Sequence, residues 1–220
     1  MSDLSILLNT VEIRLRETMQ VFAANQTLNC AAQKDEQLHS LLNANFSFWH
    51  ACSVGFCSHV IQGMAALTEP RRDSATIQRA IDIVTARFGP NSVPDSVKSD
   101  VIRIHQQYKR FRDKLVSHTD VHRTTIADEF DARGFSWNSI GRDLTDLCRA
   151  HGTLCQISAG QKTTLPNAEV RTISMSEWIS IHTAHDTERV LDALKPALPT
   201  LAQPANLPQM LFSEKFEDSV

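Results

Sequence analysis

The sequence predicts an all-α protein, an antiparallel bundle of five or six helices, on three observations. The chain of 220 residues contains only 7 glycines and 8 prolines, which is few for a protein that turns often between short strands. Apolar residues recur at intervals of three and four along almost the whole chain, which is the spacing of a helix face. The breaks between these stretches are short, and long helices with short connections pack antiparallel.

The composition is that of a folded protein with a sizeable core. Hydrophobic residues make up 42% of the chain and charged residues 21%, which is enough apolar surface for one domain. We expect this single domain over 1–196, followed by a proline-containing tail over 197–220 that is extended or disordered. The formal net charge of −3 excludes a protein that is basic over its whole surface, but it allows a local basic patch.

The cysteines and the apolar stretches favour the cytoplasm. Five cysteines, an odd number, without an apolar signal segment at the N-terminus argue against the disulfide framework of a secreted protein. The most apolar stretch, 38–67, is interrupted by polar residues too often for a span that faces lipid. We therefore expect a cytoplasmic protein that does not enter a membrane.

The first two helices are predicted over 3–29 and about 36–67. One apolar stripe runs along the first and consists of Leu4, Leu8, Val11, Leu15, Met19 and Phe22. Asp35 can cap the second helix, which ends before Pro70. Because the second helix carries apolar side chains on several faces, we expect it at the centre of the bundle.

The third and fourth helices flank a glycine–proline pair. Asp73 and Ser74 are expected to open the third helix, and Gly89 closes it because glycine tolerates the left-handed cap. The fourth follows Ser92, a cap residue with a proline in the first turn after it. Its apolar stripe is the cleanest in the chain and consists of Val97, Val101, Ile104, Tyr108, Phe111 and Leu115. His118 is the next position in that series.

The remaining helices lie on either side of a predicted loop. A fifth helix begins at Ser136 or Ser139 and stops at Gly152. Residues 153–173 show no helical period, so we expect an irregular loop there. A capping box at 174–177 begins a final helix that runs to about residue 195.

The end of the fourth helix is the most basic part of the chain. Residues 98–123 contain seven Lys and Arg, three Asp and three His, a balance of +4 in a protein of net charge −3. Phosphate is the natural partner of such a cluster. Arg110, Lys114 and His118 are four residues apart, so they form one ridge beside the apolar stripe. Arg112 can converge with His118 only if the helix ends or bends just before that histidine, or if its long side chain reaches across.

The segment from Arg112 to His118 reads Arg-Asp-Lys-Leu-Val-Ser-His. It resembles the motif of HEPN-domain nucleases, which is an Arg, a polar residue, a few further residues and a His. That family carries the motif late in a long helix of a helical bundle, as here. Residues 108–120 look most like the abortive-infection branch of the family, and helix order and lengths extend the resemblance over 1–150.

The resemblance implies a HEPN-like fold and a metal-independent endoribonuclease of a phage-defence or toxin system. In this family the Arg and His of two subunits converge in the site of a homodimer. A ribose 2′-hydroxyl attacks the adjacent phosphodiester, which leaves a cyclic phosphate and a 5′-hydroxyl. The implied substrate is RNA, no metal or other cofactor is implied, and an antitoxin or defence-system protein can be a partner.

The residue types at these positions fit that chemistry. An unperturbed imidazole such as that of His118 titrates in the range that proton transfer needs, and Arg112 can fork onto phosphoryl oxygens as charge develops. Asp113 can orient either side chain, and Asp120 can fix the tautomer of His118. The candidate catalytic residues are therefore Arg112, His118 and Asp113, and the candidate substrate-binding residues are Arg110, Lys114 and Asp120.

Other interpretations stay open. One is a non-catalytic HEPN-like bundle that binds a partner protein or nucleic acid, in which Arg112 is a surface residue and His118 packs at a helix end. Another is a regulator that is recruited through the proline-rich tail. Cys148, His151 and Cys155 have a spacing that crosses a helix end, but a fourth ligand is missing, so we expect no metal site.

Overall fold

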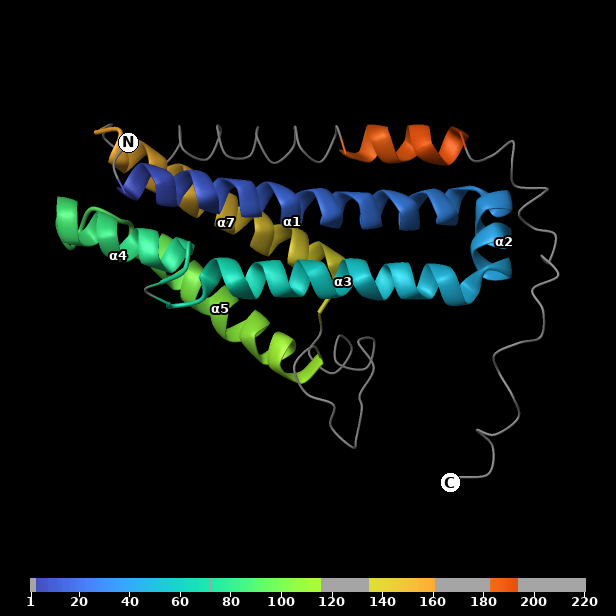
Figure 1. Ribbon diagram of the computed structural model, residues 1–220, viewed down its shortest axis with the longest axis horizontal. Helices are drawn as coiled ribbons and strands as arrows, with labels where there is room; N and C mark the ends of the chain where they lie inside the picture. The colour runs from blue at the N-terminus through green and yellow to red at the C-terminus, as the bar shows by residue number, and fades with distance from the viewer. Residues whose placement is uncertain (1–2, 72, 116–134, 161–182, 194–220) are drawn as a thin grey trace, which may run out of the picture.

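The computed structural model describes residues 3–71, 73–115, 135–160 and 183–193. Within these ranges every regular element is an α-helix (Figure 1), which confirms the all-α prediction. The helices are α1 (Asp3–Lys34), α2 (Glu36–Ala44), α3 (Phe46–Thr68), α4 (Ile77–Phe88), α5 (Asp95–Leu115) and α7 (Trp137–Ser158). Residues 183–193 are also helical, whereas the capping box at 174–177 and the tail 197–220 lie outside the described residues.

The two longest helices, α1 and α3, set the shape of the molecule. They lie side by side, and the short α2 joins them at one end (Figure 1). Toward the other end, α5 packs on α3 and α7 packs on α1, with α4 beside them. Gly63 allows α1 and α3 to approach, because a Cβ at this position would collide with the Thr18 side chain.

The apolar stripes predicted for the first and fourth helices face the core. The buried stripe residues of α1 are Leu4, Leu8, Val11, Leu15 and Met19, with Phe22 partly buried against them. Those of α5 are Val97, Val101, Ile104, Tyr108 and Phe111. Burial of one such side chain contributes about 1.5–3 kcal/mol, so the two stripes stabilise the packing of α1 and of α5 on α3 and α7.

The predicted helix over 36–67 is wrong as a single element, because it is divided at Asn45. Asp35 does cap α2, and its side chain accepts hydrogen bonds from the backbone N–H groups of Gln37 and Leu38 at 3.0 and 3.1 Å. At the other end, the Asn45 side chain donates to the Leu41 carbonyl at 3.1 Å. Asparagine competes in this way for helical hydrogen bonds, and the backbone of Asn45 leaves helical geometry with φ −117° and ψ 37°.

The expected central position of this segment holds for only part of α3. The buried residues of α3 lie between Cys57 and Thr68, where α1 and α5 cover it. Its first half lies with α2 beyond the ends of α5 and α7 (Figure 1), and Phe46 and Phe48 are 63% and 61% exposed. By length and composition, α3 is the helix among the described residues that is apolar enough to cross a membrane, but much of its C-terminal half is buried in the protein.

The start of α4 and of α5 differs from the prediction. Thr76, rather than Asp73 or Ser74, caps α4 by accepting a hydrogen bond from the Arg79 N–H at 3.1 Å. Gly89 ends α4 as predicted, but with φ +103° and ψ 161° it has an extended backbone of positive φ and not the predicted left-handed helical cap. The Ser92 hydroxyl donates to the Gly89 carbonyl at 2.7 Å, so it closes this turn instead of capping α5.

Ser136 begins α7, and it forms a capping box with Ser139. The expected stop at Gly152 is wrong, because the helix continues to Ser158 and includes the first six residues of the predicted loop over 153–173. The reason is packing, since Leu154 and Ile157 are buried in the core beyond the glycine. That burial outweighs the cost of about 1 kcal/mol for a glycine inside a helix.

Candidate functional site

Arg112 lies in the last turn of α5, near the point where α3 ends. Its Nη1 is 3.4 Å from Oε2 of Glu69, the residue directly after α3. Its Nε and Nη2 donate to Oδ1 of Asp113 at 3.2 and 3.1 Å. The Arg112 side chain is 24% exposed, so two carboxylates hold a guanidinium that solvent still reaches.

Of the other predicted site residues whose side chains the structure describes, Arg110 and Asp113, only Asp113 contacts Arg112. Arg110 is exposed on α5 and has no contact with Arg112 among those that the structure describes. Lys114 lies in the last turn of α5, where its side chain is not described. His118 and Asp120 lie outside the described residues.

A histidine that the sequence analysis did not select lies on the same face of α5 as this arginine. His105 precedes Arg112 by seven residues, two turns of α5, so both point to the same face. The Nδ1 atom of His105 is buried and has no hydrogen-bond partner in the described part of the chain. Glu69, Lys109, Arg112 and Asp113 all act electrostatically on it.

The surroundings keep His105 neutral. Partial burial lowers the pKa of His105 below its usual 6.5, and the positive charge of Lys109 lowers it further against the opposing charge of Glu69. A neutral imidazole can accept a proton, and a guanidinium can stabilise an anion. We call Glu69, His105, Arg112 and Asp113 the Arg112 cluster. The spacing of seven residues between its histidine and its arginine is the sequence signal that could have found it.

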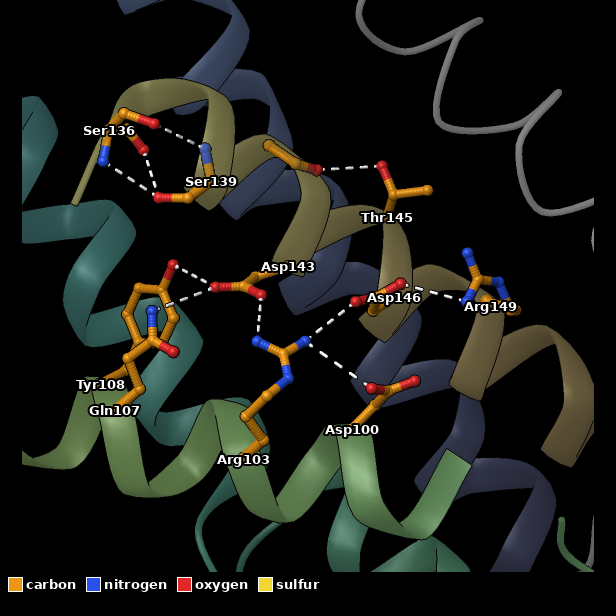
Figure 2. Close-up of polar contacts among 11 residues, drawn as sticks. Asp100, Arg103, Gln107, Tyr108, Ser136, Ser139, Asp143, Thr145, Asp146 and Arg149 are labelled. Carbon is orange, nitrogen blue, oxygen red and sulfur yellow. Dashed lines mark hydrogen bonds and ion pairs between the residues drawn. The ribbon is translucent and has the colours of Figure 1, made fainter. Parts of the chain in front are cut away.

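A second polar cluster ties α5 to α7 and surrounds the buried Asp143 (Figure 2). The Asp143 carboxylate accepts hydrogen bonds from Arg103 Nη1 at 2.7 Å, Tyr108 Oη at 3.0 Å and Gln107 Nε2 at 3.4 Å. Arg103 also pairs with Asp146 at 3.0 Å. Burial and the Asp143 carboxylate raise the pKa of Tyr108 far above its usual range, so the phenol remains a donor.

This cluster joins α5 to α7, and its central carboxylate is fully engaged in doing so. Each Asp143 oxygen already accepts a hydrogen bond, and its side chain is only 6% exposed. Arg103 is part of the basic segment that the sequence predicts, and its two carboxylate partners on α7 neutralise it. Carboxylates of α7 therefore offset part of the positive charge of α5 in the folded protein.

An open groove of about 900 Å³ lies between α1 and the first half of α7. Phe22 and Trp137 form a tilted ring pair at one side, with centroids 5.7 Å apart. Arg142 and Arg149 line the same groove, and Arg149 pairs with Asp146. The groove thus combines aromatic rings with guanidinium groups.

The groove begins close to the end of α5. Phe135, two residues before Trp137, packs edge-on against Phe111 with ring centroids 4.6 Å apart. It also contacts Tyr108, at 5.7 Å. Since Phe111 directly precedes Arg112, the start of α7 and the Arg112 cluster belong to the same end of the bundle.

The cysteine and histidine residues of α7 are engaged in packing. His151 Nε2 is 3.0 Å from the Leu8 carbonyl, which only accepts, so this nitrogen carries the proton. Cys155 Sγ lies 3.5 Å from the same nitrogen, and Cys148 Sγ contacts Met19 Sδ at 3.2 Å. Within the described ranges, no group of three or more His, Cys, Asp or Glu side chains is arranged to hold a metal ion.

No family model, curated protein or solved structure matches this chain.

Proposed function

We propose that the protein is a metal-independent endoribonuclease of a phage-defence or toxin system, with a HEPN-like fold and Arg112 in its active site. The observation that carries this proposal is the state of Arg112. It is fixed by Asp113, partly open to solvent and located six residues before His118 at the end of a bundle helix. This is the arrangement expected for a guanidinium that contacts a phosphate.

In the proposed reaction a ribose 2′-hydroxyl loses its proton and attacks the adjacent phosphorus. The bond to the 5′-oxygen breaks, and that oxygen takes a proton to leave as a hydroxyl, so the products are a 2′,3′-cyclic phosphate and a 5′-hydroxyl end. His118 acts as the general acid–base catalyst, and Arg112 stabilises the charge that develops on the phosphoryl oxygens. Asp113 orients Arg112, while Arg110, Lys114 and Asp120 contact the substrate or position His118.

The groove between α1 and α7 supports RNA as the substrate. An aromatic ring such as that of Trp137 can stack on a base, and a guanidinium such as that of Arg142 can contact the RNA backbone. In a protein of net charge −3, such local basic groups have to provide the attraction for RNA. In this proposal the protein is a cytoplasmic homodimer that an antitoxin or a defence-system partner can restrain.

A non-catalytic HEPN-like bundle is the second candidate, and the Glu69 contact favours it. Glu69 and Asp113 together bind three guanidinium nitrogens of Arg112. In this second candidate Arg112 is a structural residue, and its contact with Glu69 ties the end of α5 to the end of α3. In that case the bundle binds a partner protein or nucleic acid without cleaving it.

Cleavage of labelled tRNA and mRNA by the purified protein, with chelator in excess, distinguishes the two candidates. The ribonuclease proposal predicts cleavage by the wild type and loss of at least about 100-fold in rate for Arg112→Ala and His118→Ala. Arg87→Ala and His39→Ala, at exposed positions on α4 and α2, are the matched controls and should cleave normally. RNA that remains intact with all proteins, or cleavage that survives both site substitutions, contradicts the proposal.

A further inference from the structure

The first half of α3 presents exposed aromatic rings on a helix without charge. From Phe46 to Thr68 the helix contains no Asp, Glu, Lys or Arg. Phe46 and Phe48 are 63% and 61% exposed. Phe46 stacks on His50 with ring centroids 5.3 Å apart, and Phe48 meets the edge of the Trp49 ring at 5.1 Å. Exposed apolar side chains that gather at one place indicate an interaction site, whereas single ones are common.

Small side chains separate these rings. At about 100° per residue, Phe46 and Phe48 lie at the two edges of the exposed side of the helix. Between them lie the exposed residues Ser47, Ala51 and Gly55. A Cβ atom added at Gly55 would meet no other atom within 4 Å. We call these five residues, together with Trp49, the α3 face. An extended chain can lie along its small residues and place side chains against the rings on either side.

The described part of the chain ends close to the α3 face. The helix over 183–193, orange in Figure 1, runs toward α2. Its Leu191 is buried against Leu38 and Leu41 of α2. Phe46 follows Leu41 by five residues, which span at most about 18 Å. The residues that follow this helix therefore start near the exposed rings of α3.

The sequence that follows this helix has the composition that an uncharged aromatic surface binds. Residues 196–213 contain no Asp, Glu, Lys or Arg. They contain four prolines, at 196, 199, 204 and 208, and this density favours an extended polyproline backbone. The largest apolar side chains among them are Leu207, Met210, Leu211 and Phe212. Proline-rich segments bind aromatic surfaces in this extended form, because they lose little conformational entropy on binding.

We propose that residues 204–212 bind the α3 face of the same chain. The connection, residues 194–203, can span about 31 Å at 3.1 Å per residue. The first half of α3, from Phe46 to Cys57, is about 17 Å long at 1.5 Å per residue, so the segment can reach all of the α3 face. Since neither surface carries a charge, no ion has to lose its water when they meet.

The tether favours this occupant over a separate molecule. A flexible connection of this length holds the segment at an effective concentration in the millimolar range. A second copy of the chain at micromolar concentration is therefore at a disadvantage of about a thousandfold. This contact goes beyond the proposed function and does not depend on RNA cleavage.

Disulfide formation within the full chain tests the contact. Ala51→Cys with Met210→Cys places one thiol on the α3 face and one in the 204–212 segment. Cys30→Ser and Cys52→Ser remove the native thiols that lie outside the core in this region. The matched control is Arg87→Cys with Met210→Cys, because Arg87 is exposed on α4 at the other end of the bundle (Figure 1).

Under mild oxidation we expect the Ala51→Cys chain to form its internal disulfide at least about tenfold faster than the control, because binding adds to the effect of the tether. Adding Phe46→Ser with Phe48→Ser should remove this difference. Leu211→Glu with Phe212→Glu should do the same. Circular dichroism should show unchanged helix content in all of these chains.

Three results overturn the proposal. Equal rates for the two thiol positions, or a fast rate that survives both sets of substitutions, show that the segment meets the surface at random. A disulfide between two chains, with none within one, shows that a second copy supplies the occupant. Flotation of the wild type with phosphatidylcholine vesicles, without the internal disulfide in the variant, shows that lipid is the occupant. Failure of RNA cleavage leaves the disulfide rates unaffected, so the two proposals fail separately.

Discussion

Asp143→Ala removes the centre of the cluster that joins α5 to α7. The buried carboxylate accepts hydrogen bonds from Arg103, Gln107 and Tyr108. Without it, the Tyr108 hydroxyl stays buried and loses the acceptor that the structure gives it, since Tyr108 is 0% exposed. Loss of Asp143 costs less for the Arg103 guanidinium, because its side chain is 46% exposed to solvent and keeps Asp146 as a partner.

The expected loss in the free energy of unfolding follows from these contacts. Removal of one partner from a buried, hydrogen-bonded charge pair costs about 3–5 kcal/mol. Because Arg103 can be solvated and paired again, we expect the lower end, about 3 kcal/mol. Tyr108→Phe removes one hydrogen bond of the cluster and should cost about 1–2 kcal/mol. The double variant should lose less than the sum, because both substitutions remove the same bond.

Urea denaturation followed by circular dichroism measures these differences. Asp82→Ala is the matched control, since Asp82 is exposed on α4 and accepts a single hydrogen bond, from Gln78 at 3.2 Å, within the described part of the chain. We expect it to change the free energy of unfolding by less than about 0.5 kcal/mol. If Asp143→Ala lost less than about 1 kcal/mol, the cluster would not be what holds α5 on α7.

Four further predictions follow from other contacts. Gly63→Ala should lower the free energy of unfolding by about 1 kcal/mol despite the better helix propensity of alanine, because the added Cβ collides with the Thr18 side chain. Thr18→Ala in the same chain should remove this loss. Stability should fall as the pH decreases from about 7.5 to 5.5, because burial lowers the pKa of His105 and of His151 in the folded state, so the unfolded chain binds more protons in this range. His105→Gln should reduce this fall in urea titrations, and equal stability across the range would contradict the account. Glu69→Gln should tighten RNA binding in a filter-binding assay, because it removes the carboxylate that competes with phosphate for Arg112; unchanged affinity would show that the ion pair does not compete. Arg142→Glu should weaken RNA binding, whereas Arg87→Glu should have little effect, since Arg142 lines the groove and Arg87 lies on α4.

The buried stripes of α1 and α5 were predictable because they depend on one helix at a time. A run such as Val97, Val101 and Ile104 fits a helix face and no other regular element, and all three residues are buried. The limits of the helices depend on competition between local and distant contacts. The backbone leaves helical geometry at Asn45, which ends α2, whereas α7 continues past Gly152 because Leu154 and Ile157 are buried in the core beyond it.

The candidate site was predictable only in part. The sequence indicates Arg112 through the motif that ends at His118, and the structure adds one partner that is distant in the sequence, Glu69 at 3.4 Å. His105 could have been selected from its seven-residue spacing to Arg112, but the motif directs attention toward His118. The exposure of Phe46 and Phe48 depends on how far α3 extends beyond α5 and α7. Local sequence patterns do not predict this relative position of the helices.

The most direct test of the account is the chemistry of the RNA ends. Wild-type protein, incubated with a defined RNA in excess chelator, should leave 2′,3′-cyclic phosphate and 5′-hydroxyl ends, and a 2′-deoxy substitution at the cleaved nucleotide should block the cut. Ends that carry a 5′-phosphate, or cleavage that persists on the 2′-deoxy substrate, would contradict a reaction that begins with the ribose hydroxyl and depends on Arg112.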